Sequence, residues 1–327
     1  MESTAVAPWP LTTTAARHLV HRPGRSAGPG AGEEEFVLTG PLPGPHPLGG
    51  TAAPGAFHDL QAAAEMLREV GEVIGQEHFR VPADRTGIFY RFALDAGDLE
   101  AWRRGPGEAE LTSHVRVSAE KVLDGVPRAL EFTVRHEIDG ADAGHGSAHL
   151  LFLPPLLHRN HRESSRTATL KAAAAAGSGS APAEVPGGRP VAPAEVGRTD
   201  PAHVLLRGAA ASGDGRLTAE VCPPRRWPGS SPADTHASSP MLLETVRQAS
   251  LLAVHRTGGA PTERLAPAAL QLHFRGYAEA DLPLRAAVVT GPAGLDPRGR
   301  RLVPLTLTLA QAGRAVLEAR TTVAEDR

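Results

Sequence analysis

Two helix-like segments of the chain carry the same pattern of charges. The first, "EMLREVGEVIG", begins at Glu65, and the second, "ETVRQASLLAV", begins at Glu244. In each segment an arginine follows the glutamate by three residues, at Arg68 and Arg247. Residues three apart in an α-helix lie on the same face, so each glutamate is placed beside its arginine. A pattern that recurs in both halves of a chain indicates an internal duplication, and a duplication strongly restricts the fold.

The segments around the two helices also correspond. Upstream, "EEFVLTG" aligns with "AHVLLRG", which places Gly40 opposite Gly208. Downstream, "FYRFALDAGDL" from Phe89 aligns with "LHFRGYAEADL" from Leu272. Each half then ends in two strand-like runs joined by a turn: "ALEFTVRHEI" and "SAHLLFL" in the first half, "LVPLTLTLAQ" and "RAVLEARTTV" in the second. The alternation in "LTLTL" is typical of a β-strand. Each half therefore predicts an α+β unit, with a strand, a long helix and several antiparallel strands.

The length of 327 residues favours two domains at roughly 100–200 residues each. Between the halves lies "ATLKAAAAAGSGSAPAEVPGGRPVAPAE", which begins at Ala168. Its Ala, Gly, Ser and Pro residues offer little to pack, which predicts a flexible linker. The predicted organisation is therefore an N-terminal tail at 1–17, a first repeat at 18–158, a linker at 159–190 and a second repeat at 191–327.

Composition excludes several classes of function. The formal net charge is -2 and the pI about 6.7, so no basic surface is expected for nucleic acid. No signal peptide, run of 18 apolar residues or block of Lys/Arg is evident, so a cytoplasmic protein without membrane attachment is expected. The single cysteine, Cys222, excludes an intrachain disulfide and a zinc site built on cysteines. His158 and His161 are interpreted as part of a solvated loop, and we expect no metal and no cofactor.

The two helices differ in the residues around their charges. On the first helix Glu65, Arg68, Glu69 and Glu72 share one face, which is compatible with either a solvated stripe or a functional site. The second helix is apolar nearly all round and is predicted to be buried. Its Glu244–Arg247 pair would stabilise a helix by only ~0.2–0.5 kcal/mol, whereas desolvation costs several kcal/mol per ion. A polar pocket beside the second helix explains the pair better than helix stability does.

Three short motifs resemble a known family. "LVHRPGRSAGPGAGEEEFVLTG" from Leu19, "EHFRVP" from Glu77 and "MLLETVRQASLLAVH" from Met241 are similar, in this order, to the A-factor biosynthesis (AfsA-like) hotdog family. The resemblance covers both halves and implies a tandem double hotdog, in which each antiparallel sheet wraps a long helix and the halves pack as a pseudo-dimer. The sequence departs from the family at Glu69, where glutamine is usual, and at Ser239-Pro240, where the family has a Pro-Gly turn.

The resemblance also implies an activity. The family joins a β-ketoacyl thioester, carried on acyl carrier protein or coenzyme A, to a hydroxyl of dihydroxyacetone phosphate, in the synthesis of γ-butyrolactone, butenolide or furan signals. Its functional residues map onto Glu65, Glu244 and Arg247, with Arg68 as the first-half equivalent of Arg247. The resemblance thus predicts Glu244 and Glu65 as catalytic residues and Arg247 and Arg68 as ligands of the phosphate.

Elementary chemistry agrees with these roles. A desolvated glutamate can act as the base for the attacking hydroxyl, and arginine forms bidentate contacts with phosphate. The more buried second helix is expected to carry more of the chemistry. Two alternatives remain: a hotdog thioesterase or dehydratase, and a non-catalytic acyl-binding protein. The acyl carrier and the oligomeric state, with a homodimer among the options, are left open.

Overall fold

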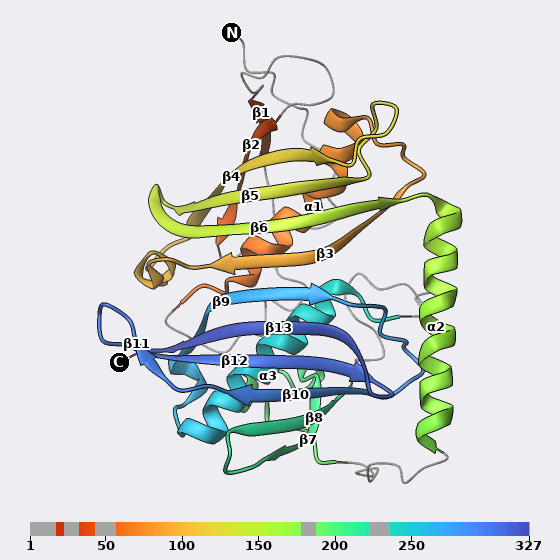
Figure 1. Ribbon diagram of the computed structural model, residues 1–327. Helices are drawn as coiled ribbons and strands as arrows, with labels where there is room; N and C mark the ends of the chain where they lie inside the picture. The colour runs from red at the N-terminus through yellow and green to blue at the C-terminus, as the bar shows by residue number, and fades with distance from the viewer. Residues whose placement is uncertain (1–17, 23–32, 43–56, 178–187, 223–235, 327) are drawn as a thin grey trace. The chain divides into compact units, whose positions relative to one another are not determined.

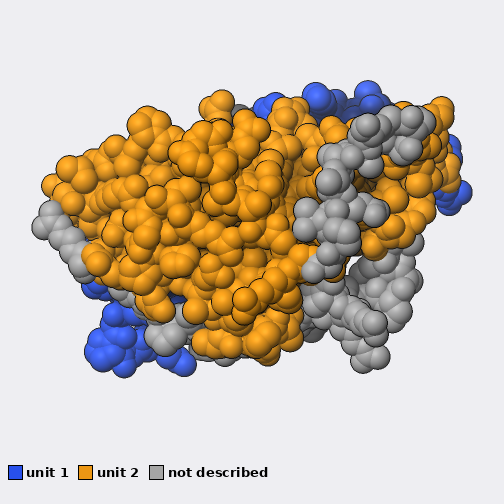
Figure 2. Space-filling model, turned by 90° about the horizontal axis from the view of Figure 1, so that it is seen from below, with its two compact units in different colours: residues 1–49, 57–159 blue, residues 50–56, 160–327 orange. Residues whose placement is uncertain are grey.

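The computed structural model describes residues 18–22, 33–42, 57–177, 188–222 and 236–326 of the chain (Figure 1). The predicted tail at 1–17 lies outside these residues. The chain divides into two compact units (Figure 2). Unit 1 comprises residues 1–49 and 57–159, and unit 2 comprises residues 50–56 and 160–327.

Unit 1 contains one long helix and an antiparallel sheet. Its elements are β1 (His18–Arg22), β2 (Glu33–Leu42), α1 (Gln61–Phe79), β3 (Thr86–Asp95), the short helix η2 (Leu99–Trp102), β4 (Ala109–Glu120), β5 (Ala129–Ile138) and β6 (Ala141–Leu153). The strand order is β1-β2-β4-β5-β6-β3, and every neighbouring pair is antiparallel. Helix α1 packs on β2, β3 and β4, so one side of the sheet and the inner face of the helix form the core.

Two glycines allow α1 to lie close to this sheet. A Cβ atom at Gly71 would lie 2.6 Å from Cζ of Phe89 on β3. A Cβ atom at Gly75 would clash with the ring of Phe152 on β6. Glycine in the middle of a helix is destabilising by roughly 0.5–1 kcal/mol relative to alanine. The close contact between the helix and the two aromatic rings gives a physical reason for both glycines.

Unit 2 has the same plan. After α2 (Pro155–Gly177), most of which belongs to this unit, it contains η3 (Pro193–Val196), η4 (Pro201–His203), β7 (Leu206–Ala211), β8 (Arg216–Val221), α3 (Ser239–Gly258), η5 (Thr262–Arg264), β9 (Leu265–Phe274), β10 (Leu284–Thr290), β11 (Gly294–Leu295), β12 (Arg301–Gln311) and β13 (Arg314–Glu325). The strand order is β9-β13-β12-β10-β8-β7, with the short β11 beside β12. From Met241 to Val254 every residue of α3 is buried except Arg247, as the apolar pattern predicts.

The topology confirms the predicted correspondence of the two helices and of the later strands, but it corrects one alignment. In unit 1 the strand before the helix is β2, and in unit 2 it is β8. The sequence comparison instead matched β2 with the stretch that contains β7. The error arose because the glycines used for the match are not equivalent: Gly40 lies within the regular β2, whereas Gly208 has a positive φ of 57° at an irregularity of β7.

The range 159–190, predicted as a flexible linker, contains helix α2 as far as Gly177, and residues 178–187 lie outside the described residues. This difference has two physical causes. Alanine has the highest helix propensity, so "AAAAA" extends the helix until the glycine that follows. The second cause is that Arg162 and Arg166 of α2 bind Glu279 of unit 2. Nothing in the low-complexity sequence after Ala168 indicates these contacts. The limits of the two repeats, 18–158 and 191–327, stay a prediction.

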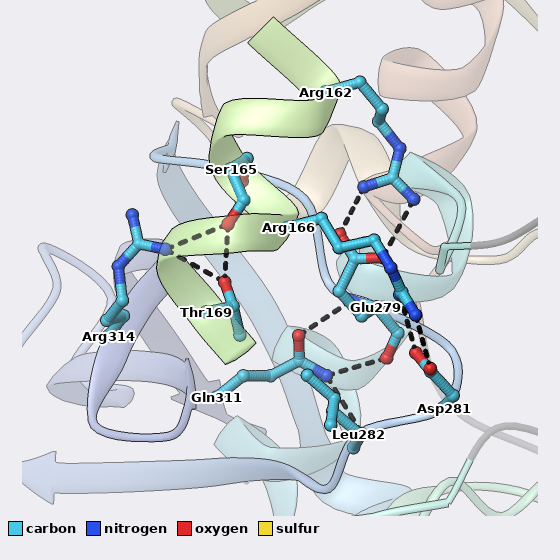
Figure 3. Close-up of polar contacts among 9 residues, drawn as sticks. All are labelled: Arg162, Ser165, Arg166, Thr169, Glu279, Asp281, Leu282, Gln311 and Arg314. Carbon is cyan, nitrogen blue, oxygen red and sulfur yellow. Dashed lines mark hydrogen bonds and ion pairs between the residues drawn. The ribbon is translucent and has the colours of Figure 1, made fainter. Parts of the chain in front are cut away.

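A cluster of charged groups fixes α2 to unit 2 (Figure 3). Arg162 forms a two-point ion pair with Glu279, and Arg166 donates to the same carboxylate at 2.8 Å. The Glu279 side chain is fully buried. Burial alone would raise the pKa of Glu279, but the hydrogen bonds from Arg162 and Arg166 outweigh it and lower that pKa. Gln311 accepts from the backbone N–H of Glu279 at 2.7 Å and donates to its carbonyl at 2.8 Å, which holds the carboxylate in place.

The helices α1, α2 and α3 contain 19, 23 and 20 residues. Within the described ranges, none of the helices is long and apolar enough to cross a membrane.

Candidate functional site

Glu244 lies in the second turn of α3. The helix starts after Ser238, has Pro240 near its first position, where proline is favoured, and ends at Gly259 in the left-handed conformation. Glu244 is 0% exposed. A carboxylate at this depth requires compensating charges or hydrogen bonds, because its desolvation is otherwise strongly unfavourable.

The main partner of Glu244 is Arg198, a residue that the sequence analysis did not select. Nε of Arg198 donates to Oε1 of Glu244 at 2.9 Å, and Nη2 lies 2.6 Å from Oε2. The pair therefore combines one hydrogen bond with a second close contact between the two charged groups. Arg198 is only 2% exposed, so the pair is enclosed on both sides. A signal for Arg198 is present in "VGR" from Val196, which resembles the "VHR" from Val20 in the first half.

Arg247 is close to Glu244, as the helical spacing predicts, but it is the weaker partner. Its Nη1 lies 3.5 Å from Oε1 of Glu244 and donates to the carbonyl of Val196 at 3.2 Å. The side chain is 11% exposed, so it reaches from the buried pair towards the surface of unit 2. Glu244 therefore faces two guanidinium groups, and the three side chains together carry one net positive charge.

Gln248, one turn after Glu244, completes this network. Its Nε2 donates to Oε1 of Glu244 and to the carbonyl of His203, both at 2.7 Å. Its Oε1 accepts from the backbone N–H of Leu205 at 2.8 Å. Gln248 and Arg198 thus attach the segment before β7 to α3, so that Glu244 lies at the centre of a closed set of polar contacts.

The equivalent pair on α1 has different surroundings. Nε of Arg68 donates to Oε2 of Glu65 at 2.8 Å. The Glu65 side chain is 6% exposed and the Arg68 side chain is 37% exposed. Oε1 of Glu65 is buried and has no hydrogen-bond partner among the described residues. The terminal nitrogens of Arg68 likewise donate to no group within the described ranges.

The two interpretations of the first helix are both partly realised. Glu72 is exposed and Glu69 is half-buried, as expected for a solvated stripe. Glu65 is buried and so does not belong to that stripe. Glu69 occupies the position that aligns with Gln248, and its negative charge replaces the amide that supports Glu244 on α3. The glutamate–arginine motif is therefore conserved in spacing between the helices but not in its supporting contacts.

Metal-ligating side chains gather at one other place in the described part of the chain. Glu120, Glu131 and His149 bring their ligand atoms within 4.8 Å of one another, and all three are half-exposed. Nε2 of His149 lies 3.4 Å from Oε1 of Glu131. His158 and His161 are on helix α2 rather than in the predicted loop, and neither belongs to this group.

Comparisons with known proteins place this chain in a family. Residues 181–324 match the family described as the A-factor biosynthesis hotdog domain, AfsA. The chain is 30% identical over 272 residues to the 2-oxo-3-(phosphooxy)propyl 3-oxoalkanoate synthase of Streptomyces coelicolor, an alignment that covers 80% of this chain and 76% of that relative. The long-helix, antiparallel-sheet units define a hotdog protein. More specifically, the chain belongs to the A-factor biosynthesis hotdog family, which confirms the resemblance seen in the sequence.

Two solved structures align with most of the chain. The chain aligns with a protein described as an oleoyl thioesterase from Lactobacillus plantarum at 10% identity and a TM-score of 0.50, over 92% of this chain and 100% of that one. A bifunctional dehydratase-cyclase domain in ambruticin biosynthesis aligns at 20% identity and a TM-score of 0.46, over 94% and 96% of the two chains. The likeness to the first structure confirms the hotdog fold. The packing of the two units as a pseudo-dimer stays a prediction.

Proposed function

We propose that this protein is an acyltransferase that joins a β-ketoacyl group to a hydroxyl of dihydroxyacetone phosphate. In the reaction the hydroxyl oxygen attacks the thioester carbonyl, a C–O bond forms and the C–S bond breaks. The thiol of the carrier leaves with the proton that the hydroxyl loses. The products are a phosphorylated ester and a free thiol, and no oxidant or reductant is required. The carrier of the acyl group is acyl carrier protein or coenzyme A.

The family relationship supports this reaction. The Streptomyces coelicolor relative is named for a product in which a 3-oxoalkanoate is esterified with a 2-oxo-3-(phosphooxy)propyl group. The alcohol of that ester is dihydroxyacetone phosphate. The observation that carries the proposal on this chain is a buried glutamate beside an arginine on the central helix of each hotdog unit.

Glu65 is the better of the two candidate bases. A general base needs a lone pair within hydrogen-bond reach of the proton that it removes. Oε1 of Glu65 has no hydrogen-bond partner in the described part of the chain. In contrast, Oε1 of Glu244 accepts from Arg198 and Gln248, and Oε2 of Glu244 lies 2.6 Å from Nη2 of Arg198. We therefore assign proton removal to Glu65.

Glu244 acts through its neighbours in this proposal. It holds Arg198 and Arg247 by charge, and Gln248 fixes its orientation. We interpret Glu244 as a positioning residue for these arginines rather than as the base. The sequence analysis expected the more buried second helix, α3, to carry more of the chemistry, whereas this proposal assigns the base to α1.

The phosphate of the acceptor requires a cation. Arg68 and Arg247 are the two candidates, and Arg68 is favoured because its terminal nitrogens have no partner within the described ranges and its side chain is 37% exposed. Arg247 already donates to the Val196 carbonyl and is 11% exposed. A planar guanidinium binds two phosphate oxygens at once, which an ammonium group cannot do.

Mass spectrometry of a single reaction tests the proposal. The protein is incubated with a β-ketoacyl thioester, with and without dihydroxyacetone phosphate. An acyltransferase forms the phosphorylated ester only when the acceptor is present. Free β-keto acid formed without the acceptor would identify a thioesterase, and an unchanged thioester would identify a binding protein. Either of these two results would contradict the proposed function.

A further inference from the structure

Two buried polar side chains at the start of α1, His58 and Gln61, have no role in the proposed reaction. Gln61, the first residue of the helix, is 1% exposed, and Glu65, four residues later, is 4% exposed. A spacing of four residues places these two side chains along one face of the helix. His58 precedes the helix and is 5% exposed. We refer to His58, Gln61 and Glu65 together as the buried polar row.

Five polar atoms of this row have no partner. They are Nδ1 and Nε2 of His58, Oε1 and Nε2 of Gln61, and Oε1 of Glu65, all buried and without a hydrogen bond to any described part of the chain. In folded proteins at least 90% of buried polar groups are hydrogen-bonded. A buried amide with neither its donor nor its acceptor satisfied is unfavourable for folding and calls for a specific reason.

Poor local order is not that reason. The backbone N–H of Gln61 donates to Oδ1 of Asp59 at 3.1 Å, and the N–H of His58 donates to the Trp102 carbonyl at 2.8 Å. Burial, and next the charge of Arg104, lower the pKa of His58, so its ring is neutral at pH 7. The backbone around the row is thus fixed, and the atoms that lack hydrogen bonds to the described residues belong to the side chains.

We propose that Gln61 and Glu65 bind the hydroxyketone end of the acceptor. Oε1 of Glu65 accepts the hydrogen bond of the attacking hydroxyl, and Nε2 of Gln61 donates to the neighbouring ketone oxygen. The inference rests on the proposed function, because it takes dihydroxyacetone phosphate as the acceptor. The acceptor fits better than the acyl donor, since a carboxylate oxygen needs a donor group and the β-ketoacyl thioester offers carbonyl oxygens instead.

The matched residue for an experiment is Gln248 on α3. Its amide is as buried as that of Gln61, at 0% exposure, but it is fully bonded to Leu205, His203 and Glu244. Substitution by methionine keeps the length of the side chain and removes the amide at either position. Because the Gln61 amide side chain has no hydrogen bond to the described residues to lose, Gln61→Met should melt at or above the wild-type temperature without substrate. Gln248→Met should melt several degrees lower.

This melting experiment can overturn the inference directly. A lower melting temperature for Gln61→Met would mean that its amide is already satisfied in the free protein, for example by a buried water molecule. The bonded control shows what the loss of a satisfied amide looks like in the same protein. Thermal unfolding followed by circular dichroism measures both variants.

Ligand binding tests the assignment to the ketone. Isothermal titration with dihydroxyacetone phosphate should give a dissociation constant roughly tenfold higher for Gln61→Met than for the wild type, the scale of one lost hydrogen bond in a buried site. Glycerol 3-phosphate has a hydroxyl in place of the ketone. The wild type should bind it more weakly than dihydroxyacetone phosphate, and this preference should disappear in Gln61→Met. Equal affinities of both proteins for dihydroxyacetone phosphate would contradict the inference.

Binding and turnover separate this inference from the proposed function. If the wild type binds dihydroxyacetone phosphate, Gln61→Met binds it more weakly and no ester forms, the binding site is supported and the transferase activity is contradicted. If the wild type forms the ester and Gln61→Met binds the acceptor equally well, the transferase activity is supported and the role of Gln61 is contradicted.

Discussion

The central helices of the two units carry the same Glu-x-x-Arg motif in opposite environments. On α3, Glu244 is fully buried and is held by Arg198, Gln248 and Arg247. On α1, Glu65 is almost as buried, and Arg68, which is partly exposed, holds it from within the described residues. Oε1 of Glu65 accepts no hydrogen bond from these residues, whereas Oε1 and Oε2 of Glu244 lie 2.9 and 2.6 Å from donor nitrogens of Arg198. Identical spacing therefore does not imply an identical role.

The difference indicates how a duplicated chain can divide its work between two copies. A buried ion pair with every partner present contributes to a specific local structure, and the loss of one partner is strongly destabilising. An incompletely satisfied carboxylate is unfavourable in the free protein but is available to a substrate. We interpret α3 as the copy that organises its unit and α1 as the copy that performs the chemistry.

The largest expected effect is on turnover when the base is removed. Glu65→Gln preserves the shape of the side chain and removes its basicity, so turnover should fall by ~10²–10⁴-fold, the usual scale for general acid–base catalysis. The melting temperature should change little, because among the described residues the Glu65 carboxylate accepts a hydrogen bond from Arg68 alone. Steady-state kinetics and thermal unfolding of the same preparation measure both quantities. If the Glu65→Gln variant is folded and keeps near-wild-type turnover, Glu65 is not the base and α1 does not perform the chemistry.

The equivalent change on α3 should act on stability instead. Glu244→Gln leaves Arg198, which is 2% exposed, without its counter-charge. Removal of one partner from a buried pair typically costs ~3–5 kcal/mol. Urea denaturation should therefore show a much lower midpoint than for the wild type. If Glu244→Gln instead keeps the wild-type midpoint and loses turnover, the roles of the two helices are the reverse of those assigned here.

Much of this fold is predictable because side chains that face the core recur at regular intervals along a strand or helix, and apolar residues occupy these positions in the sequence. The alternating residues of β12 and β13 and the apolar surface of α3 reflect direct contact with a core. The Glu244–Arg247 contact was predictable for the same reason, since a helix fixes which residues are neighbours. The polar pocket predicted beside α3 from the cost of burying charge stays a prediction; the described residues show Arg198, Arg247 and Gln248 around Glu244 there.

Other features depend on contacts between distant segments and leave no such trace. Arg198 lies in a non-periodic segment 46 positions before Glu244, so no helical or strand rule pairs them. Most of helix α2 lies in the range predicted as a linker, because its alanines have no periodic pattern. Glu279, which binds Arg162 and Arg166 of this helix, is more than 110 positions later in the chain, so no local rule pairs these residues. The lack of a hydrogen bond from the Gln61 amide side chain to the described residues depends on three-dimensional packing alone.

A smaller effect should separate the two arginines. Arg68→Lys keeps the charge and loses the planar fork, so the KM for dihydroxyacetone phosphate should rise roughly tenfold while kcat changes less. Arg247→Lys should change this KM less, because Arg247 is already engaged with Val196 and Glu244. Initial-rate kinetics with a varied acceptor concentration measure both variants. A larger increase in KM for Arg247→Lys would assign the phosphate to α3.

Unit 2 contains a second closed carboxylate that extends the comparison. Glu279 is 0% exposed and, like Glu244, lies against two arginines, in this case Arg162 and Arg166 of α2 (Figure 3). If closed networks in this unit serve stability, Glu279 should behave as Glu244 does and unlike Glu65. Asp281 provides an internal control, because it also binds Arg166 but its side chain is 56% exposed.

The last and smallest expected effect is the pH dependence of this second network. Burial opposes ionisation of Glu279, but the bonds from Arg162 and Arg166 prevail and lower its pKa below the ordinary value of 4.5. An acid with a lowered pKa in the folded state contributes stability that is complete above pH 4.5 and is lost as the pH falls through the lowered pKa. The urea midpoint of Glu279→Gln should therefore lie below that of the wild type at pH 7, and the gap should narrow below pH 4.5. Asp281→Asn should give a smaller gap at pH 7, because solvent screens an exposed pair. A gap for Glu279→Gln that is no larger than the gap for Asp281→Asn would mean that the two-arginine arrangement does not stabilise unit 2, and the same interpretation of Glu244 would lose its support.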